Sequence, residues 1–278
     1  MEVPGCAVVT GAASGLGFAL ARALGARGHG LVLLDRDAEA LQEAMARLED
    51  LGVRILEVPA DVATPGGWQQ AFSAFQSLGG PLAWLVNAAG VAVAGSVVDV
   101  PAEDWRRAVE VNLLGPVWGC QAFLPVLLRQ TTGRVLNIAS RTAFSSPPMM
   151  GPYTASKAGL VAFTETLASE LEGTGITATV ACPGYFRSGL ASRMRAHPPT
   201  LGDLAARVMA ESGRSAEEVA AVLLRHADAG DLYAIPGGQD RALWRFKRLA
   251  PRTCLRTVRR KHFEAMDRGG GGEGSGPR

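Results

Sequence analysis

A tyrosine and a lysine four residues apart, Tyr153 and Lys157, suggest proton-transfer chemistry. On a helix the two side chains share one face. A tyrosine titrates near about 10, so a base for neutral pH needs its pKa lowered by ~3 units, or ~4 kcal/mol. One lysine ammonium at ~5 Å supplies ~3 kcal/mol at an effective dielectric of ~20, whereas burial acts the other way. Such a pair also arises by chance, so it needs support from other residues.

Two polar residues stand where apolar ones are expected. Ser140 follows the apolar run 134–138, at the end of a predicted strand, and Asn112 lies in an apolar stretch of a predicted helix. A buried asparagine should have hydrogen-bond partners, and the residue after a parallel strand lies at the ligand-binding edge of the sheet. Both residues are therefore candidates for the site of Tyr153 and Lys157.

A glycine-rich turn at 10–17 follows the first apolar run and opens the first predicted helix. Glycines permit a tight turn and the close approach of a pyrophosphate, and the free N–H groups of a helix N-terminus favour an anion. The spacing departs from the general GxGxxG pattern, so a purely structural turn is about as plausible on this evidence. The candidate cofactor contacts are Thr10, Gly11, Ser14, Gly15, Leu16 and Gly17.

The acidic residue Asp35 ends the second apolar run and could accept hydrogen bonds from the adenosine ribose. Its charge would repel the 2′-phosphate of NADP, which carries about −1.5 to −2 charges, so NAD is favoured over NADP. The adjacent Arg36 could restore NADP binding, which keeps that cofactor as the less favoured choice. The alternative for Asp35 is a helix N-cap, but Asp37 can take that position.

Strand-like and helix-like segments alternate along most of the chain. Continuous apolar runs, typical of strands buried on both faces, occur at 6–9, 31–34, 54–58, 82–86, 134–138, 176–181 and 232–235. Segments with helical character occur at 16–27, 37–51, 68–78, 101–130, 153–172 and 215–227. The alternation predicts an α/β fold with a doubly wound parallel sheet of the Rossmann type, which binds ligands at the carboxyl ends of its strands.

In the order and spacing of its motifs, the chain resembles the short-chain dehydrogenase/reductase family over residues 5–190. The matching features are the turn at 10–17, Asp61-Val62, Asn87-Ala88-Ala89-Gly90, Asn112, Ser140, Tyr153 with Lys157, and Pro183-Gly184.

The resemblance implies a catalytic set and further cofactor contacts. Tyr153 would be the general acid/base, and Lys157 its electrostatic partner and a ribose-binding group. Ser140 would hold the substrate oxygen, and Asn112 a water of a proton relay. Asp61 and Val62 would contact the adenine. The segment that includes Asn87, Ala88 and Gly90 would steady the sheet beside the cofactor, with Pro183, Gly184 and Ser188 near the nicotinamide.

The function expected is hydride transfer between NAD(H) and an alcohol or ketone, by a homodimer or homotetramer. Apolar residues after Ser140 and Gly184 suggest an apolar substrate; they are Phe144, Met149, Met150, Tyr185 and Phe186. The arginines Arg141, Arg187 and Arg193 could instead grip an acid. A non-catalytic dinucleotide sensor is the alternative function, but it should have lost part of the catalytic set.

The bulk composition narrows the class of protein. The chain has 278 residues, 47% of them apolar and 19% charged, which supports a large core and argues against disorder. A net charge of +2 gives no reason to expect a nucleic-acid partner. Four scattered cysteines without metal-ligand spacing and a start without a secretory signal lead us to expect a cytoplasmic protein with no metal site.

The C-terminal part differs from the rest. We expect a catalytic domain at 1–240, a basic helical extension at 241–268 and a disordered tail at 269–278. Residues 241–278 carry 11 Lys/Arg and 3 Asp/Glu, or +8, which leaves −6 on the other 240 residues. The extension could lie on an anionic membrane surface, but Pro251 interrupts it, so packing on protein is favoured. The long connection at 185–214 is expected to be a functional lid.

Overall fold

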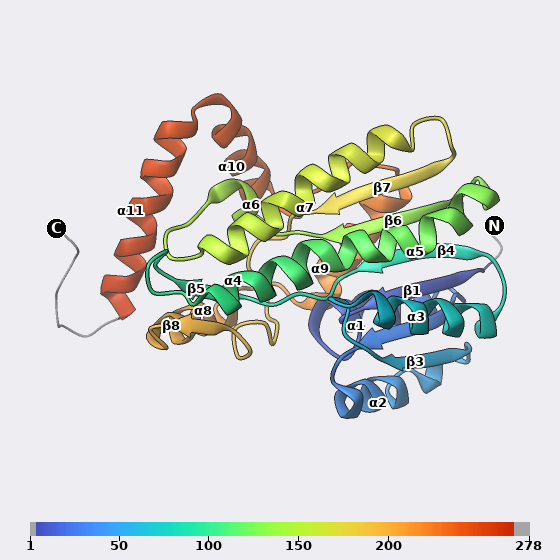
Figure 1. The fold of residues 1–278 in the computed structure, drawn as a ribbon. Helices are drawn as coiled ribbons and strands as arrows, with labels where there is room; N and C mark the ends of the chain where they lie inside the picture. Colours follow the sequence, from blue (N-terminus) through green and yellow to red (C-terminus); the bar gives the residue numbers. More distant parts are fainter. Residues whose placement is uncertain (1–3, 270–278) are drawn as a thin grey trace.

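A seven-stranded parallel sheet forms the centre of the computed structural model, which describes residues 4–269 (Figure 1). The strand order is β3-β2-β1-β4-β6-β7-β9. The strands are β1 (Cys6–Thr10), β2 (Gly30–Asp35), β3 (Ile55–Pro59), β4 (Leu82–Asn87), β6 (Gly133–Ile138), β7 (Ile176–Ala181) and β9 (Tyr233–Ala234). The chain runs outward from β1 to β3 and then returns to β4 on the other side of β1. This reversal places the ligand crevice at the carboxyl ends of β1 and β4, as the doubly wound prediction requires.

Helices cover both faces of the sheet. Alternate residues of β1 enter different apolar clusters: Ala7 and Val9 face one side, and Cys6 and Val8 the other. This is the period-two alternation of a strand buried on both faces. On the first side pack α1 (Gly15–Gly25), α2 (Ala38–Ala46) and α9 (Ala216–Asp228); on the second pack α3 (Pro65–Leu78), α5 (Gly115–Gln130) and α7 (Gly151–Glu170).

Several helix ends follow from local sequence. Asp37 is the N-cap of α2 and accepts from Ala40 N at 3.1 Å, so Asp35 does not have that role. A short 3₁₀ turn, Glu49–Leu51, replaces the end of the helix predicted to reach 51. Helix α3 begins at Pro65, earlier than predicted, because Thr64 caps it and proline suits the first helical turn.

The long helical segment predicted at 101–130, with its pattern interrupted at Gly115-Pro116, has three parts. Helix α4 (Ala102–Val109) leads into a π-helical stretch, Glu110–Leu114, and then into α5. By length and composition, Ala102–Gln130 could span a membrane, at a mean hydropathy of 1.5. Core helices pass the same test, and Phe123 and Leu127 here are fully buried against the sheet.

The predicted lid at 185–214 contains regular structure. Strand β8 (Arg195–His197) pairs in parallel with β5 (Val93–Gly95), and α8 (Thr200–Ala210) follows. Buried Asp104 of α4 fixes this segment, accepting from Arg195 at 2.5 Å and from His197 Nε2 at 2.8 Å. Burial opposes the ionisation of Asp104, but the two hydrogen bonds outweigh it and lower the pKa of the carboxyl.

The C-terminal extension forms two helices, α10 (Gly238–Leu249) and α11 (Pro251–Gly269). The break falls at Pro251, as predicted, while the extension begins at Gly238 rather than at 241. Figure 1 shows α11 beside α10 at the end of the molecule that also holds α6 (Thr142–Ser145), α8 and β8. Helix α11 ends at residue 269, the first of the tail predicted to be disordered, and 270–278 lie outside the described residues.

Candidate active site

One cavity of about 1000 Å³ lies at the carboxyl ends of β1 and β4 and collects most of the predicted site residues. Those that line it are Gly11, Ser14, Gly15, Leu16, Gly17, Asp35, Arg36, Asp61, Val62, Ala88, Gly90, Ser140, Tyr153, Lys157, Pro183, Gly184 and Ser188. Thr10, Asn87 and Asn112 are the predicted site residues that do not line it.

The glycine turn has the geometry of a ligand cradle. Gly11 and Gly15 have φ values of 65° and 56°, in the region that glycine tolerates best. A Cβ on Gly17 would lie 2.1 Å from the carbonyl oxygen of Gly11, so a side chain there would displace the backbone. Because the N-terminus of α1 opens into the cavity beside this turn, the described residues fit the pyrophosphate of a dinucleotide.

Thr10 supports the turn from behind. Its hydroxyl accepts from the backbone N–H groups of Ala88 and Ala89, each at 3.0 Å, and the residue is 1% exposed. It therefore ties the end of β1 to the end of β4, and the prediction that Thr10 contacts the cofactor is not supported. The hydroxyl stabilises the crevice from within the sheet.

Asn87 is also turned away from the cavity. Its Nδ2 donates to Asn137 Oδ1 at 2.8 Å, and Asn137 Nδ2 donates to Thr164 Oγ1 at 3.0 Å. Within residues 4–269, Asn87 Oδ1 has no hydrogen-bond partner. This buried chain joins β4, β6 and α7, which agrees with a role in steadying the sheet and not with direct cofactor contact.

Asp35 ends β2 and lies beside the glycine turn. Its carboxylate accepts from Ala13 N and from Asp37 N, both at 3.2 Å. The carboxylate is thus held between the glycine turn and the start of α2, and it lines the cavity together with Arg36.

Asp61 is paired with an arginine that sequence reasoning missed. Its Oδ1 accepts from Ala63 N at 2.9 Å, and its Oδ2 lies 2.9 Å from Arg107 of α4. Burial opposes ionisation of this carboxyl, but the Ala63 bond and the Arg107 pair outweigh it and lower its pKa. Arg107 also lines the cavity. It stands far from Asp61 in the sequence, so no local pattern marked it.

Asn112 joins two segments of the candidate site through hydrogen bonds of its side chain. Its amide accepts from Val91 N and donates to Val91 O, both at 2.9 Å, and donates to Ser156 Oγ at 3.0 Å. The residue is fully buried in the π-helical stretch, a feature that often occurs at functional sites. These bonds tie the loop after β4 to α7, and the water-holding role stays a prediction.

Ser140, Tyr153 and Lys157 meet at one wall of the cavity. Ser140 follows β6, and its side chain hydrogen bonds with that of Tyr153. Lys157 Nζ donates to the carbonyl oxygen of Ile138 at 2.7 Å and lies 6.0 Å from the centroid of the Tyr153 ring. All three residues are less than 8% exposed, at 7%, 7% and 4%. One strand end and one helix turn thus bring two hydroxyl groups and an amine together.

Burial dominates the titration of this group. It raises the pKa of Tyr153 to about 12, against the opposing effect of the Ser140 hydrogen bond. Burial also lowers the pKa of Lys157 to about 8. The expected lowering of the tyrosine pKa by Lys157, with the positive nicotinamide ring of NAD⁺ adding to it, stays a prediction; here desolvation of the phenolate is the largest influence and raises the pKa.

The lid brings an arginine to the glycine turn. Arg193 Nη2 donates to Ser14 Oγ at the N-terminus of α1, and both residues line the cavity. The guanidinium therefore lies beside the backbone N–H groups that would meet a pyrophosphate. The sequence marked Arg193 as a possible grip for an acidic substrate, and the structure places it at the cofactor end instead.

Only some of the residues predicted to contact the substrate line the cavity. Met149, Met150, Tyr185 and Phe186 line the cavity, whereas Phe144 packs into an apolar cluster outside it. Arg187 does not line it either, because it lies on a separate shallow depression beside α1.

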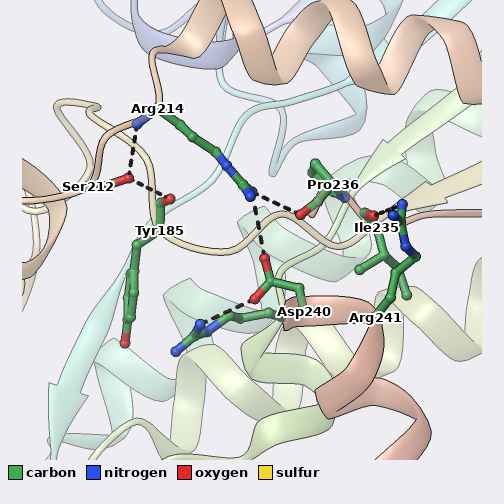
Figure 2. A network of polar contacts seen from close by, with 8 residues as sticks. Tyr185, Ser212, Arg214, Ile235, Pro236, Asp240 and Arg241 are labelled. Atoms are coloured by element: carbon green, nitrogen blue, oxygen red, sulfur yellow. Dashed lines mark hydrogen bonds and ion pairs between the residues drawn. The ribbon is translucent and has the colours of Figure 1, made fainter. Parts of the chain in front are cut away.

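A polar network joins the lid, the catalytic edge and the C-terminal extension (Figure 2). Buried Asp240 of α10 accepts from Arg141 at 3.2 Å and lies 3.9 Å from Arg214. Arg141 follows Ser140 and stacks over the Tyr185 ring at 4.4 Å, while Arg214 donates to Pro236 O at 3.0 Å. Arg141 is thus neutralised by Asp240, which argues against its gripping an acidic substrate.

Comparisons with known proteins agree with this geometry. The family described as short chain dehydrogenase matches residues 5–199. The 2-(R)-hydroxypropyl-CoM dehydrogenase of Xanthobacter autotrophicus is 35% identical over 78% of this chain and 89% of that protein. The galactitol 2-dehydrogenase (L-tagatose-forming) of Cereibacter sphaeroides is 31% identical over 84% of this chain and 94% of that protein.

Solved structures show the same fold. A short-chain dehydrogenase/reductase from Burkholderia phymatum in complex with NAD has a TM-score of 0.85 and 28% identity, over 91% of this chain and 96% of that one. A short-chain dehydrogenase from Sphingobium yanoikuyae in complex with NADPH has a TM-score of 0.76 and 27% identity, over 92% and 97%. With the matched residues 5–199, the parallel sheet and the Ser140, Tyr153 and Lys157 cluster, the chain belongs to the short-chain dehydrogenase/reductase family of oxidoreductases.

Proposed function

We propose that this protein transfers a hydride between NAD(H) and the carbon of an apolar secondary alcohol or ketone, with Tyr153 as its proton-transfer group. The observation that carries the proposal is the placement of the hydrogen-bonded Ser140 and Tyr153 in the same cavity as the glycine turn and Asp35. When bound, NAD(H) supplies or accepts the hydride.

Ser140 and Tyr153 would bind the substrate oxygen through their hydroxyl groups. A tyrosine whose pKa is raised to about 12 is protonated at neutral pH, which is the form that donates a proton to a ketone oxygen. For the reverse reaction, Tyr153 Oη must first lose its proton, so alcohol oxidation should rise with pH. Lys157 stands close enough to the Tyr153 ring for its ammonium to stabilise the phenolate, although burial is the larger effect.

Asp35 supports NAD as the preferred cofactor. Its carboxylate faces the cavity from the end of β2, and a 2′-phosphate beside it would suffer like-charge repulsion. Arg36 lines the same region and is the residue through which NADP could still bind.

The test is Tyr153→Phe. We expect turnover of alcohols and ketones to be lost, while NADH fluorescence titration gives a dissociation constant close to that of the unmodified protein. Activity retained in Tyr153→Phe would remove this hydroxyl from the mechanism. NADH binding by the unmodified chain without turnover of any member of a broad substrate panel would favour the dinucleotide-sensing alternative.

A further inference from the structure

The cavity continues past the catalytic residues into a space walled by three helices that come late in the chain. Each helix turns one face toward it, with side chains at helical spacing. These residues are Leu204 and Val208 of α8, Leu243 and Phe246 of α10, and Val258 and Ala265 of α11. We call this set the distal wall. It lies on lid and C-terminal elements, outside the motifs from which the family was recognised.

The protein does not cover the distal wall with its own side chains. Leu204, Val208, Leu243 and Phe246 are only half-buried, whereas Leu223 of α9, which packs on the sheet, is fully buried. Apolar faces left open toward an internal cavity favour an apolar ligand, because covering them removes apolar surface from water. Thr257, Lys261 and His262 of α11 also line this part of the cavity, so the open apolar surface comes mainly from α8 and α10.

Asp240 fixes the distal wall relative to the catalytic residues. It sits in the first turn of α10, and it accepts a hydrogen bond from Arg141, the residue that follows Ser140. A Cβ on Gly184 would lie 2.5 Å from Asp240 Oδ2, so α10 also packs closely on the loop after β7. The C-terminal extension is therefore joined to the active site by contacts at two points of its edge.

We propose that the distal wall binds the apolar tail of an elongated secondary alcohol or ketone and selects such substrates over short ones. This inference rests on the proposed function and deepens it. The carbonyl or hydroxyl group of the ligand meets Ser140 and Tyr153, and its tail lies along α8, α10 and α11. The C-terminal helices are then a substrate-recognition element, because Leu243, Phe246 and Val258 face the cavity.

The test uses a homologous series of straight-chain methyl ketones from butanone to undecanone. Their affinity for the NADH-loaded Tyr153→Phe variant, measured by isothermal titration calorimetry, does not depend on turnover. We expect affinity to rise about fourfold per added methylene while the tail extends along the wall, the ratio that corresponds to ~0.8 kcal/mol. In the unmodified enzyme, kcat/KM should follow the same trend.

Two substitutions on α11 distinguish an effect of the distal wall on ligand binding from a general effect of added charge. Val258→Asp places a carboxylate in the cavity and should lower the undecanone-to-butanone ratio at least ~10-fold, since a charge next to a methylene chain must be desolvated. Leu255→Asp makes the same change on a residue of α11 that is 39% exposed and does not line the cavity, and it should leave the ratio unchanged. Val258→Thr, nearly equal in shape, should have an intermediate effect. NADH affinity verifies that each variant is folded.

The outcomes are distinguishable. Affinity that does not change with chain length, or an equal response of Val258→Asp and Leu255→Asp, would overturn the distal wall even if ketones are reduced. Absence of any ketone reduction by the unmodified chain would refute the proposed function. Length-dependent binding that Val258→Asp abolishes would support the wall in either case.

Discussion

Lys157 should make the folded protein less stable at neutral pH, and removing its charge should reveal this. The side chain is 4% exposed, and burial lowers its pKa from 10.5 to about 8. A base with a lowered pKa in the folded state binds its proton more weakly there than in the unfolded chain. The ammonium therefore destabilises the fold fully below pH ~8, and this effect disappears as the pH rises above about 10.5.

The magnitude follows from the size of the shift. A difference of about 2.5 units corresponds to ~3 kcal/mol, since each unit is worth about 1.4 kcal/mol. Lys157→Met removes this penalty but also removes the donor to Ile138 O, and an unpaired buried carbonyl costs about 1–3 kcal/mol. The two effects nearly cancel near neutral pH. Only the first depends on pH, so the pH dependence is the diagnostic quantity.

The assay is urea unfolding of both proteins, followed by tryptophan fluorescence, between about pH 7 and about pH 9.5. Over that interval the unfolding free energy of the unmodified protein should rise by ~2 kcal/mol relative to that of Lys157→Met. Lys261→Met, which changes an exposed lysine, serves as the control and should show no such relative change. Lys157→Met should also lose activity. A buried charge that lowers stability but is needed for function is common at active sites.

Parallel stability curves for Lys157→Met and the unmodified protein would refute this reasoning. They would mean that the ammonium is solvated, or that another charge compensates it in the folded state. A relative change of the opposite sign would mean that the fold stabilises the charged form, in which case the Tyr153–Lys157 pair would be a charge-stabilising one as the sequence suggested.

Three further predictions concern the cofactor end and the lid. Asp35→Ser should lower the preference for NADH over NADPH at least ~10-fold in fluorescence titrations, because it removes the repulsion of a phosphate; an unchanged ratio would contradict a role in cofactor choice. Arg193→Gln should weaken ADP binding about 10-fold and adenosine binding little, because a charged hydrogen bond to phosphate is worth about 1.5–3 kcal/mol; Arg129→Gln is the control for net charge, and equal losses for the two ligands would exclude a phosphate contact. Asp104→Asn should speed hydrogen exchange in β8 and α8. In the unmodified protein, hydrogen exchange in β8 and α8 should also become faster as the pH falls through the lowered pKa of Asp104. A carboxyl with a lowered pKa contributes stability above its unfolded pKa and loses that contribution in acid. If exchange responds neither to the substitution nor to acid, Asp104 does not hold the lid.

Sequence reasoning succeeded where a signal is local. The alternation of apolar runs and helical segments predicted the parallel sheet, and the cap at Asp37 left Asp35 for another role, as observed. The helix predicted at 215–227 also forms, as α9, and the structure shows a capping box of Ser215 and Glu218 at its start. Each of these features depends on residues within a few positions of one another, so the printed order is sufficient.

Other features needed the folded chain because their partners are distant in sequence. Thr10 and Asn87 belong to the family motifs, yet both turn into the sheet, since the facing strand ends offer their hydrogen-bond partners. No local pattern marked Arg107, and Arg193 was expected at the substrate instead of the cofactor. The two arginines meet Asp61 and Ser14 only across the crevice.

The sequence by itself determined the fold class and the family and pointed to Tyr153 and Lys157 as the candidate hydroxyl and amine, because these depend on periodicity and on motif order. The tertiary structure decided the direction of the Tyr153 pKa shift and the position of the C-terminal helices at the far end of the cavity. Desolvation and cavity shape depend on how many atoms from separate parts of the chain surround a point. The sequence pattern does not specify how many atoms surround a side chain, because that number is set only when the helices and strands pack together.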